Sequence, residues 1–245
     1  MTNEIETTTI EVGDLGAYLA QPREGGTAGM LLLPMVTGIG QRIRELADDI
    51  ARAGMTAVSW DPWHGPSADD TPLQTLIQRV GTLEDEACLD EMRRLLDHMT
   101  GPLGLERVGV MGWCLGGRFA LLLASRDQRL ANVVAYHPTV PFPSPPNHVL
   151  DTAELATHIS APTMVLYPKA DTFVSWDSYA RLRDALERRP TGPSILHVYP
   201  DAGHGFGASS QHDDTVDAAA RALSWPQALA FCQATTTADG PRYPR

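Results

Sequence analysis

From residue 29 onward, short apolar runs alternate with longer segments in which apolar residues recur every three or four positions. Short apolar runs are typical of strands covered on both faces, whereas the three- and four-residue recurrence is typical of amphipathic helices. The runs predict strands at 29–34, 55–60, 107–111, 132–136, 163–167 and 195–199. The periodic segments predict helices at 42–53, 115–125, 175–188 and 213–232, and one long amphipathic segment at 73–99. The alternation predicts an α/β fold with a mostly parallel sheet and helices on both faces.

Three segments depart from this alternation. Residues 4–21 alternate polar and apolar positions around Gly13-Asp14, which predicts an antiparallel hairpin at the sheet edge. Residues 137–150 are rich in proline and follow a predicted strand, so we expect an extended loop that overhangs a site as a lid. Residues 235–245 lack apolar periodicity and are expected to form a frayed tail, and Pro226 is expected to kink or divide the last helix.

Composition narrows the class of protein. The 245 residues are expected to form a single domain over 1–234, because α/β folds of this size bury one core. The net charge of −11 argues against nucleic acid and anionic membranes as partners. The sequence has no signal-peptide pattern and no long apolar stretch, so we expect a cytoplasmic protein, monomeric or homodimeric, that acts on a small molecule.

The segment 108–119, VGVMGWCLGGRF, carries the most specific chemistry. An apolar strand runs into Gly112-Trp113-Cys114-Leu115-Gly116 and then directly into a helical pattern, which is the pattern of a nucleophile elbow with cysteine as the nucleophile. A helix N-terminus lowers a thiol pKa and favours the reactive thiolate. The alternatives are a small buried cysteine in a glycine-rich turn, or a phosphate-binding loop that lacks the usual lysine.

Two further residues follow later strands in the order that a catalytic triad of this fold requires. Asp171 comes just after the predicted strand 163–167, and His204 lies in a glycine-flanked loop after the strand 195–199. A carboxylate in the first position can fix the tautomer of the histidine, which then activates the thiol. Each residue alone could be a solvated loop residue, but the order of all three favours a triad of Cys114, His204 and Asp171.

With these residues in view, the sequence resembles the dienelactone hydrolase family. The matching motifs are the G-x-C-x-G-G elbow, an aspartate loop at Ala170-Asp171 and A-G-H-x-F at 202–206, and the resemblance runs from about residue 29 to residue 232. It implies hydrolysis of an ester or lactone. It also implies an oxyanion hole formed by the backbone amides of Val36 and Leu115.

The sequence departs from the family pattern in the residues that bind substrate. Met35 stands where the family has a glutamate beside the thiol, and the arginine expected after the catalytic histidine is missing. We therefore expect direct pairing of Cys114 with His204 and a more apolar pocket for a larger neutral ester, lactone or thioester. The residues expected to line this pocket are Met35, Trp60, Trp63, His64, Trp113, Tyr136, His137, Phe142, Phe173 and Phe206.

The leading hypothesis is a cofactor-free hydrolase that forms an acyl-cysteine intermediate. Cys88 and Cys232 lie on apolar helix faces and are expected to be structural thiols, and no histidine spacing suggests a metal site. The alternatives are a binding or regulatory protein that keeps the fold without turnover, a thioesterase or promiscuous phosphotriesterase, and a redox sensor built on a low-pKa thiolate.

Overall fold

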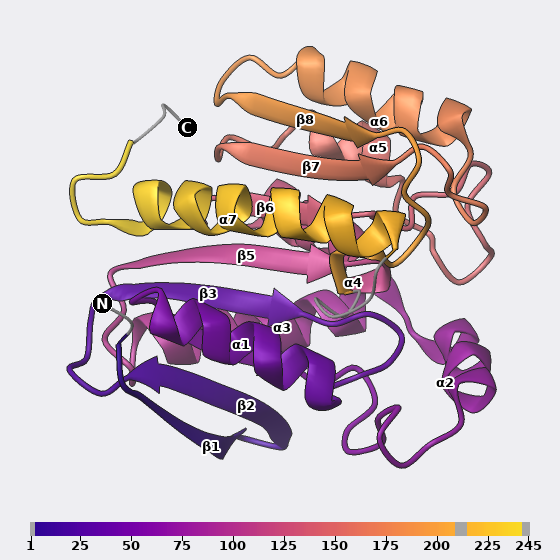
Figure 1. Ribbon diagram of the computed structural model, residues 1–245. Coiled ribbons are helices and arrows are strands. Elements are labelled where there is room, and N and C mark those ends of the chain that lie inside the picture. Colours follow the sequence, from indigo (N-terminus) through magenta and orange to yellow (C-terminus); the bar gives the residue numbers. More distant parts are fainter. Residues whose placement is uncertain (1–2, 209–214, 242–245) are drawn as a thin grey trace.

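The computed structural model describes residues 3–208 and 215–241, which form one eight-stranded sheet between two layers of helices (Figure 1). The strand order is β1-β2-β4-β3-β5-β6-β7-β8, and the strands from β4 to β8 in this order run parallel. The strands are β1 (Ile5–Val12), β2 (Leu15–Pro22), β3 (Ala28–Leu33), β4 (Thr56–Trp60), β5 (Arg107–Trp113), β6 (Val133–Tyr136), β7 (Thr163–Pro168) and β8 (Ser194–Tyr199). The predicted mostly parallel α/β sheet is confirmed.

The N-terminal hairpin forms the edge of this sheet, as expected. Strands β1 and β2 pair along their whole length around a turn in which Gly13 has a φ of 67°. β2 then pairs antiparallel with β4, so the hairpin covers the edge of the parallel sheet. Glycine occupies this turn because left-handed backbone carries no Cβ penalty there.

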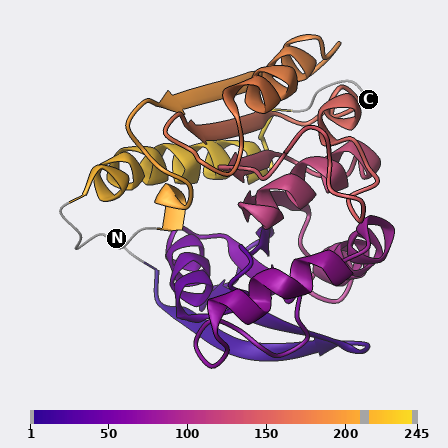
Figure 2. The ribbon, with the colours of Figure 1, turned by 90° about the vertical axis from the view of Figure 1, so that its right-hand side faces the viewer.

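The helices cover both faces of the sheet, and this arrangement is visible in Figure 1 and in Figure 2. They are α1 (Gln41–Arg52), α2 (Leu73–Arg79), α3 (Asp85–Thr100), α4 (Leu115–Arg126), α5 (Thr152–Ala156), α6 (Trp176–Glu187) and α7 (Val216–Thr236), with 3-10 turns η1 (Val80–Thr82) and η2 (Phe206–Ala208). Apolar residues of α1 and α7 pack in one buried cluster, and those of α3, α4, α5 and α6 pack in another on the opposite face.

The structure adds three details to the helix predictions. The long segment 73–99 is two helices, because η1 with Gly81 and the extended Leu83 interrupt the helical hydrogen bonding. The short helix α5 was not predicted, although the side chain of Asp151 caps it by accepting from the amide of Glu154. Helix α7 continues undivided through Pro226.

The C-terminal boundary also lies later than expected. Helix α7 includes Thr235 and Thr236, both buried, although the ordered domain was expected to end at residue 234. The side chain of Arg107, at the start of β5, donates to the carbonyl oxygens of Thr235 and Pro241. The expected tail is thus bound to the sheet as far as Pro241, while residues 242–245 and the predicted helix start at 213 lie outside the described residues.

Candidate active site

Cys114 occupies a sharp turn between β5 and α4. Its φ of 54° and ψ of −115° are rare for a residue with a side chain, and its N–H donates to the carbonyl of Tyr136 on the next strand. The turn needs the flanking glycines, because a Cβ on Gly112 would lie 2.1 Å from the carbonyl oxygen of Gly116. A Cβ on Gly116 would lie 1.9 Å from the carbonyl oxygen of Leu33. The backbone therefore has the geometry of a nucleophile elbow.

His204 bridges Cys114 and Asp171. Its Nε2 lies 3.0 Å from Sγ of Cys114, and its Nδ1 lies 2.7 Å from Oδ2 of Asp171. The two loops are joined by a hydrogen bond of 3.1 Å from the amide of Ala170 to the carbonyl of Ala202. The side chain of Asp171 is fully buried, and its other oxygen accepts from backbone amides of the loop that follows it. The three predicted residues are thus brought together at the carboxyl ends of β5, β7 and β8.

Electrostatics favour an ionised cysteine and histidine pair. Burial raises the pKa of Cys114, but the hydrogen bond and positive charge of His204 outweigh this and hold the thiol pKa below its ordinary value of 9.0. Burial lowers the pKa of His204, yet its bonds to Asp171 and Cys114 raise it to about 10. The pKa of Asp171 stays below its ordinary value, because bonds from His204 and two amides outweigh burial. The arrangement favours a thiolate beside an imidazolium.

Thr139 is a contact of the thiol that the sequence reasoning missed. Its Oγ1 lies 3.2 Å from Sγ of Cys114, and its backbone amide donates to the carbonyl of Cys114 at 3.0 Å. The available signal was a hydroxyl residue shortly after β6, the strand beside β5. Thr139 belongs to the proline-rich segment expected to form a lid, which the structure places beside the nucleophile.

The predicted oxyanion residues lie on neighbouring elements. Leu115 is the first residue of α4, and Val36 lies in the loop after β3. The amide of Gly116 donates to the carbonyl of Pro34 at 3.1 Å, which holds this loop against the start of α4. The indole of Trp63 donates to the carbonyl of Val36 at 2.8 Å and supports the loop from the other side. These contacts place both backbone segments beside Cys114.

Three of the predicted lining residues surround the histidine. The ring of His137 lies 4.9 Å from the ring of His204, and Phe173 lies at the same distance. Phe206 packs 5.8 Å from His137 and is fully buried, whereas Phe173 is exposed. Burial lowers the pKa of His137 to about 3, so this imidazole is neutral at physiological pH.

Other predicted lining residues belong to the core. Trp60 is buried under the sheet, where its indole donates to Glu91 at 2.8 Å and its ring packs on Phe119. Trp113 and Tyr136 stack on each other in the opposite cluster. Their strand positions explain this outcome, because side chains of a doubly covered strand point into one helix layer or the other.

The remaining predicted residues lie at the margins of the site. Met35 is nearly buried and packs in the cluster under α1 and α7. His64 is exposed, and its Nε2 lies 3.1 Å from a carboxylate oxygen of Glu91. Phe142 is exposed and lies beneath the guanidinium of Arg181.

A cavity of about 570 Å³ lies beside the loop after β4. Its walls include Trp63, which holds the Val36 loop, and Leu83. The cationic side chain of Arg79 faces the same cavity as the carboxylates of Glu84 and Glu91. The cavity therefore contains charges of both signs, and the three residues of the predicted triad are not among those that line it.

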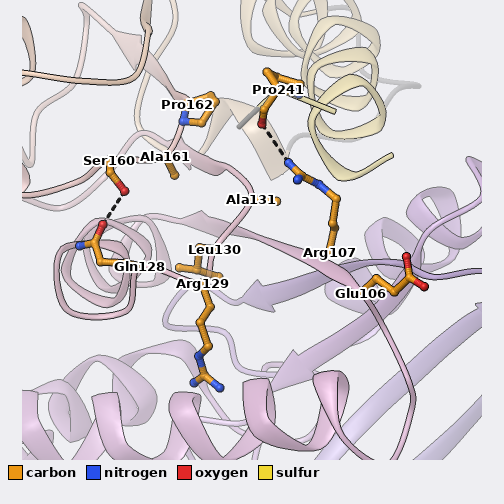
Figure 3. A pocket seen from close by; sticks show the side chains of 10 residues that line it. All are labelled: Glu106, Arg107, Gln128, Arg129, Leu130, Ala131, Ser160, Ala161, Pro162 and Pro241. Atoms are coloured by element: carbon orange, nitrogen blue, oxygen red, sulfur yellow. Dashed lines mark hydrogen bonds between the residues drawn. The ribbon is translucent and has the colours of Figure 1, made fainter. Parts of the chain in front are cut away.

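A second cavity, of about 350 Å³, lies at the amino ends of the parallel strands (Figure 3). It is lined by residues that precede or begin β5, β6 and β7, including Arg107, Ala131 and Pro162. Figure 3 shows the bond from Arg107 to the carbonyl of Pro241 at its rim. Since the proposed triad lies at the carboxyl ends of the strands, this cavity is remote from it.

Searches of the described residues for other kinds of site give two results. No described helix combines the length and apolar character needed to cross a membrane. In the part of the chain that the structure describes, no group of three or more His, Cys, Asp or Glu side chains could hold a metal ion.

Comparison with solved structures shows the same architecture. A crystal structure of a Klebsiella pneumoniae protein assigned to the dienelactone hydrolases superposes with a TM-score of 0.84 at 22% identity, covering 94% of this chain and 99% of that one. A dienelactone hydrolase-like promiscuous phosphotriesterase from metagenomic libraries superposes with a TM-score of 0.73 at 20% identity, covering 97% and 100%. These structures establish an α/β-hydrolase fold.

Sequence comparison identifies the family. A carboxymethylenebutenolidase from Rhodococcus opacus is 28% identical over 218 residues, which cover 87% of this chain and 84% of the relative. The sequence model of the dienelactone hydrolase family matches residues 15–236. Because this match spans nearly the whole chain and includes the elbow and both partner loops, the protein belongs to the dienelactone hydrolase family.

Proposed function

We propose that the protein hydrolyses a carboxylic ester or lactone without a cofactor, through a triad of Cys114, His204 and Asp171. The observation that carries the proposal is the position of His204, with one ring nitrogen 3.0 Å from the thiol and the other 2.7 Å from a buried carboxylate. Membership of a family of hydrolases supports the same reaction class. A triad of this kind activates a nucleophile through proton transfer to and from the histidine, which the carboxylate orients and stabilises.

In the acylation step, the thiolate of Cys114 attacks the carbonyl carbon and forms a tetrahedral oxyanion. The amides of Leu115 and Val36 stabilise this oxyanion, and the imidazolium of His204 gives its proton to the leaving alkoxide. The C–O bond breaks, the alcohol leaves, and an acyl group remains on sulfur. Asp171 keeps its negative charge and stabilises the imidazolium throughout.

In the deacylation step, neutral His204 takes a proton from water, and the resulting hydroxide attacks the thioester. The second tetrahedral intermediate collapses with loss of the thiolate, which releases the carboxylic acid. The imidazolium regenerated on His204 again faces the thiolate. The protein ends the cycle in its starting ionic state.

The cavity beside Trp63 supports a neutral substrate. It adjoins the Val36 loop, so the larger arm of a bound ester would extend into it from the oxyanion position. The positive charge of Arg79 is offset there by Glu84 and Glu91, which disfavours a small dicarboxylate. We therefore favour an uncharged ester or lactone with an extended acyl or alcohol group.

The test is pre-steady-state hydrolysis of a panel of nitrophenyl esters, a lactone, a thioester and a phosphotriester. Wild type is expected to release a burst of nitrophenol equal to the enzyme concentration, and mass spectrometry should find the acyl group on the peptide that contains Cys114. Cys114→Ala and His204→Gln should lose the burst and at least ~1,000-fold in kcat/KM. Cys232→Ala removes a fully buried thiol and serves as the matched control with an unchanged burst.

The panel also separates the competing functions. Turnover confined to the thioester or the phosphotriester would contradict the proposed ester hydrolysis and favour a thioesterase or a phosphotriesterase. Absence of turnover on every substrate, together with slow alkylation of Cys114, would instead favour a binding or regulatory protein. A thiol that is rapidly oxidised yet turns nothing over would favour a redox sensor.

A further inference from the structure

Among the residues that the structure describes, Arg221 is a buried cation without a hydrogen-bond partner. It lies on the second turn of α7 and is 1% exposed, and within 3–208 and 215–241 none of its three guanidinium nitrogens has a hydrogen-bond partner. By contrast, the buried Arg118 forms two bonds to Asp85, and Arg189 donates to a ring of carbonyl and hydroxyl oxygens. Burying an unpaired charge is costly, so such an arginine indicates a missing acceptor.

The nearby carboxylates of the described chain are engaged elsewhere. Glu45 and Asp49, on α1, are close enough to act on Arg221 electrostatically. Glu45 nevertheless binds Arg42 at 2.8 Å, and Asp49 binds Arg52 at 3.3 Å. Arg42 itself adds positive charge near Arg221 and, together with burial, lowers the pKa of Arg221.

The surroundings of Arg221 offer more donors than acceptors. Its guanidinium lies 5.6 Å from the ring centre of Trp225, and Trp225 packs 6.4 Å from Trp113. The indole nitrogen of Trp113 is a second buried donor without a partner. The amino ends of α1 and α7 carry partial positive charge on the same side of the sheet.

We propose that Arg221, with Arg42 beside it, forms a binding site for a small oxyanion, a carboxylate or a phosphate, between the amino ends of α1 and α7. A planar guanidinium presents paired donors that match two oxygens of such a group. The site lies on the α1 and α7 face of the sheet, whereas the cavity beside Trp63 belongs to the opposite face. We favour a free anion, because Arg221 is only 1% exposed and packs against the ring of Trp225, which leaves little room for the remainder of a larger substrate.

The test is thermal unfolding of the whole chain in increasing inorganic phosphate at constant ionic strength, with Arg221→Met as the key variant. At a phosphate concentration well above the Kd, we expect the Tm of wild type to rise saturably by about 3 °C or more. Arg221→Met should not respond and should be more stable than wild type without phosphate, because methionine removes the uncompensated charge and keeps the volume. Arg23→Gln, at an exposed position just after β2 where the arginine pairs with Glu4, is the control and should respond like wild type.

Two outcomes would overturn the proposal. Equal stabilisation of wild type and Arg221→Met would show that phosphate acts elsewhere. A Tm of Arg221→Met below that of wild type at every phosphate concentration would show that the chain itself supplies the counter-charge.

Kinetics distinguish a free anion from an anionic group carried by the substrate. If the site binds a carboxylate of the substrate, phosphate should be a competitive inhibitor of hydrolysis. Arg221→Met should then raise the KM of a carboxylate-tailed ester at least ~10-fold and leave the KM of a neutral ester unchanged. A free anion would leave the ratio of these KM values unchanged. The unfolding experiment needs no turnover, so its result is independent of the proposed hydrolysis.

Discussion

The reactivity of Cys114 depends on its neighbours more than on its position in the elbow. Burial alone raises the pKa of this thiol, and the contacts with His204, Thr139 and the amide of Leu115 reverse that effect. Cys88 and Cys232 show what burial does without such contacts: the pKa of Cys88 rises to about 12, and that of Cys232 rises further. A single described cysteine therefore combines access with a depressed pKa.

The rate of alkylation by iodoacetamide should follow this ionisation. The thiol pKa of Cys114 is lowered, so the thiolate forms as pH rises through a value below 9.0, and labelling should become fast at a lower pH than for a thiol with the ordinary pKa. In His204→Gln the charge and the ring are lost, so burial should move the labelling profile to higher pH. Superimposable profiles for wild type and this variant would contradict the ion pair.

Turnover should have a bell-shaped dependence on pH. On the acid side, activity should fall when the thiolate of Cys114 gains a proton, at a pH below 9.0. On the alkaline side, it should fall near pH 10, because His204 then loses the proton that the leaving group needs. The measurement is kcat/KM for a neutral ester between pH 5 and 11, with correction for spontaneous hydrolysis. An alkaline limb at the same pH in the residual activity of His204→Gln would disprove this assignment.

The sequence identified some of the residues around His204 and missed others. Cys114 and His204 lie in short motifs with glycine spacing, and Asp171 follows a strand, so pattern and chain order sufficed to bring them together. Thr139 lies in a segment whose prolines suggested only an extended loop. An aromatic residue on a strand, such as Trp113, can face either the substrate or a helix layer. The rotation of the strand decides between the two, and a continuous apolar run does not reveal that rotation.

At the scale of elements, the site depends on how closely α4 approaches the loop after β3. Gly116 permits that approach, since its amide donates to Pro34 and its missing side chain leaves room for the carbonyl of Leu33. The same contact holds Val36 beside Leu115. Packing between elements thus sets the distance between the two amides proposed to stabilise the oxyanion.

Gly116→Ala should therefore damage both stability and catalysis. Its Cβ would lie 1.9 Å from the carbonyl oxygen of Leu33, so the backbone must move, at a cost of about 3 kcal/mol in the free energy of unfolding. Urea unfolding measures this loss, and kcat should fall further as the two amides separate. The control is Gly16→Ala on β2, where a Cβ meets nothing within 4 Å and little change is expected. Equal stability of both variants would refute this account.

Element boundaries were harder to predict than element types. The apolar periodicity of 73–99 continues across η1 in the sequence, although α2 buries only Leu76 whereas α3 buries a full apolar face. Only local backbone geometry at Leu83 reveals the break. For α5 a usable signal did exist, since Asp151 and Glu154 have the spacing of a helix cap.

At the scale of the whole molecule, the last helix is bound to the middle of the sheet. Asn132, just before β6, donates to Oγ1 of Thr235 at 2.6 Å, and Arg107 donates to the carbonyl of the same residue. Thr235 also donates to carbonyls of its own helix. These buried contacts join segments about a hundred residues apart in the chain.

Thr235→Val should lower the stability of the entire fold. Valine keeps the shape of threonine but leaves the buried amide of Asn132 without its acceptor, at a cost of about 1–3 kcal/mol. Denaturant unfolding should shift to a lower midpoint with an unchanged m value, which would indicate one cooperative unit. Thr237→Val, at an exposed position, is the control. A lower m value would show instead that α7 detaches on its own.

The residues around the thiol enter the chain in a fixed order during synthesis. Cys114 is synthesised 90 residues before His204. The position of the His204 loop depends on the pairing of β8 with β7 and on the hydrogen bond from the amide of Ala170 to the carbonyl of Ala202. A nascent chain that has not yet reached β8 therefore lacks the partner proposed to ionise the thiol. The proposed thiolate can form only after β8 has joined the sheet.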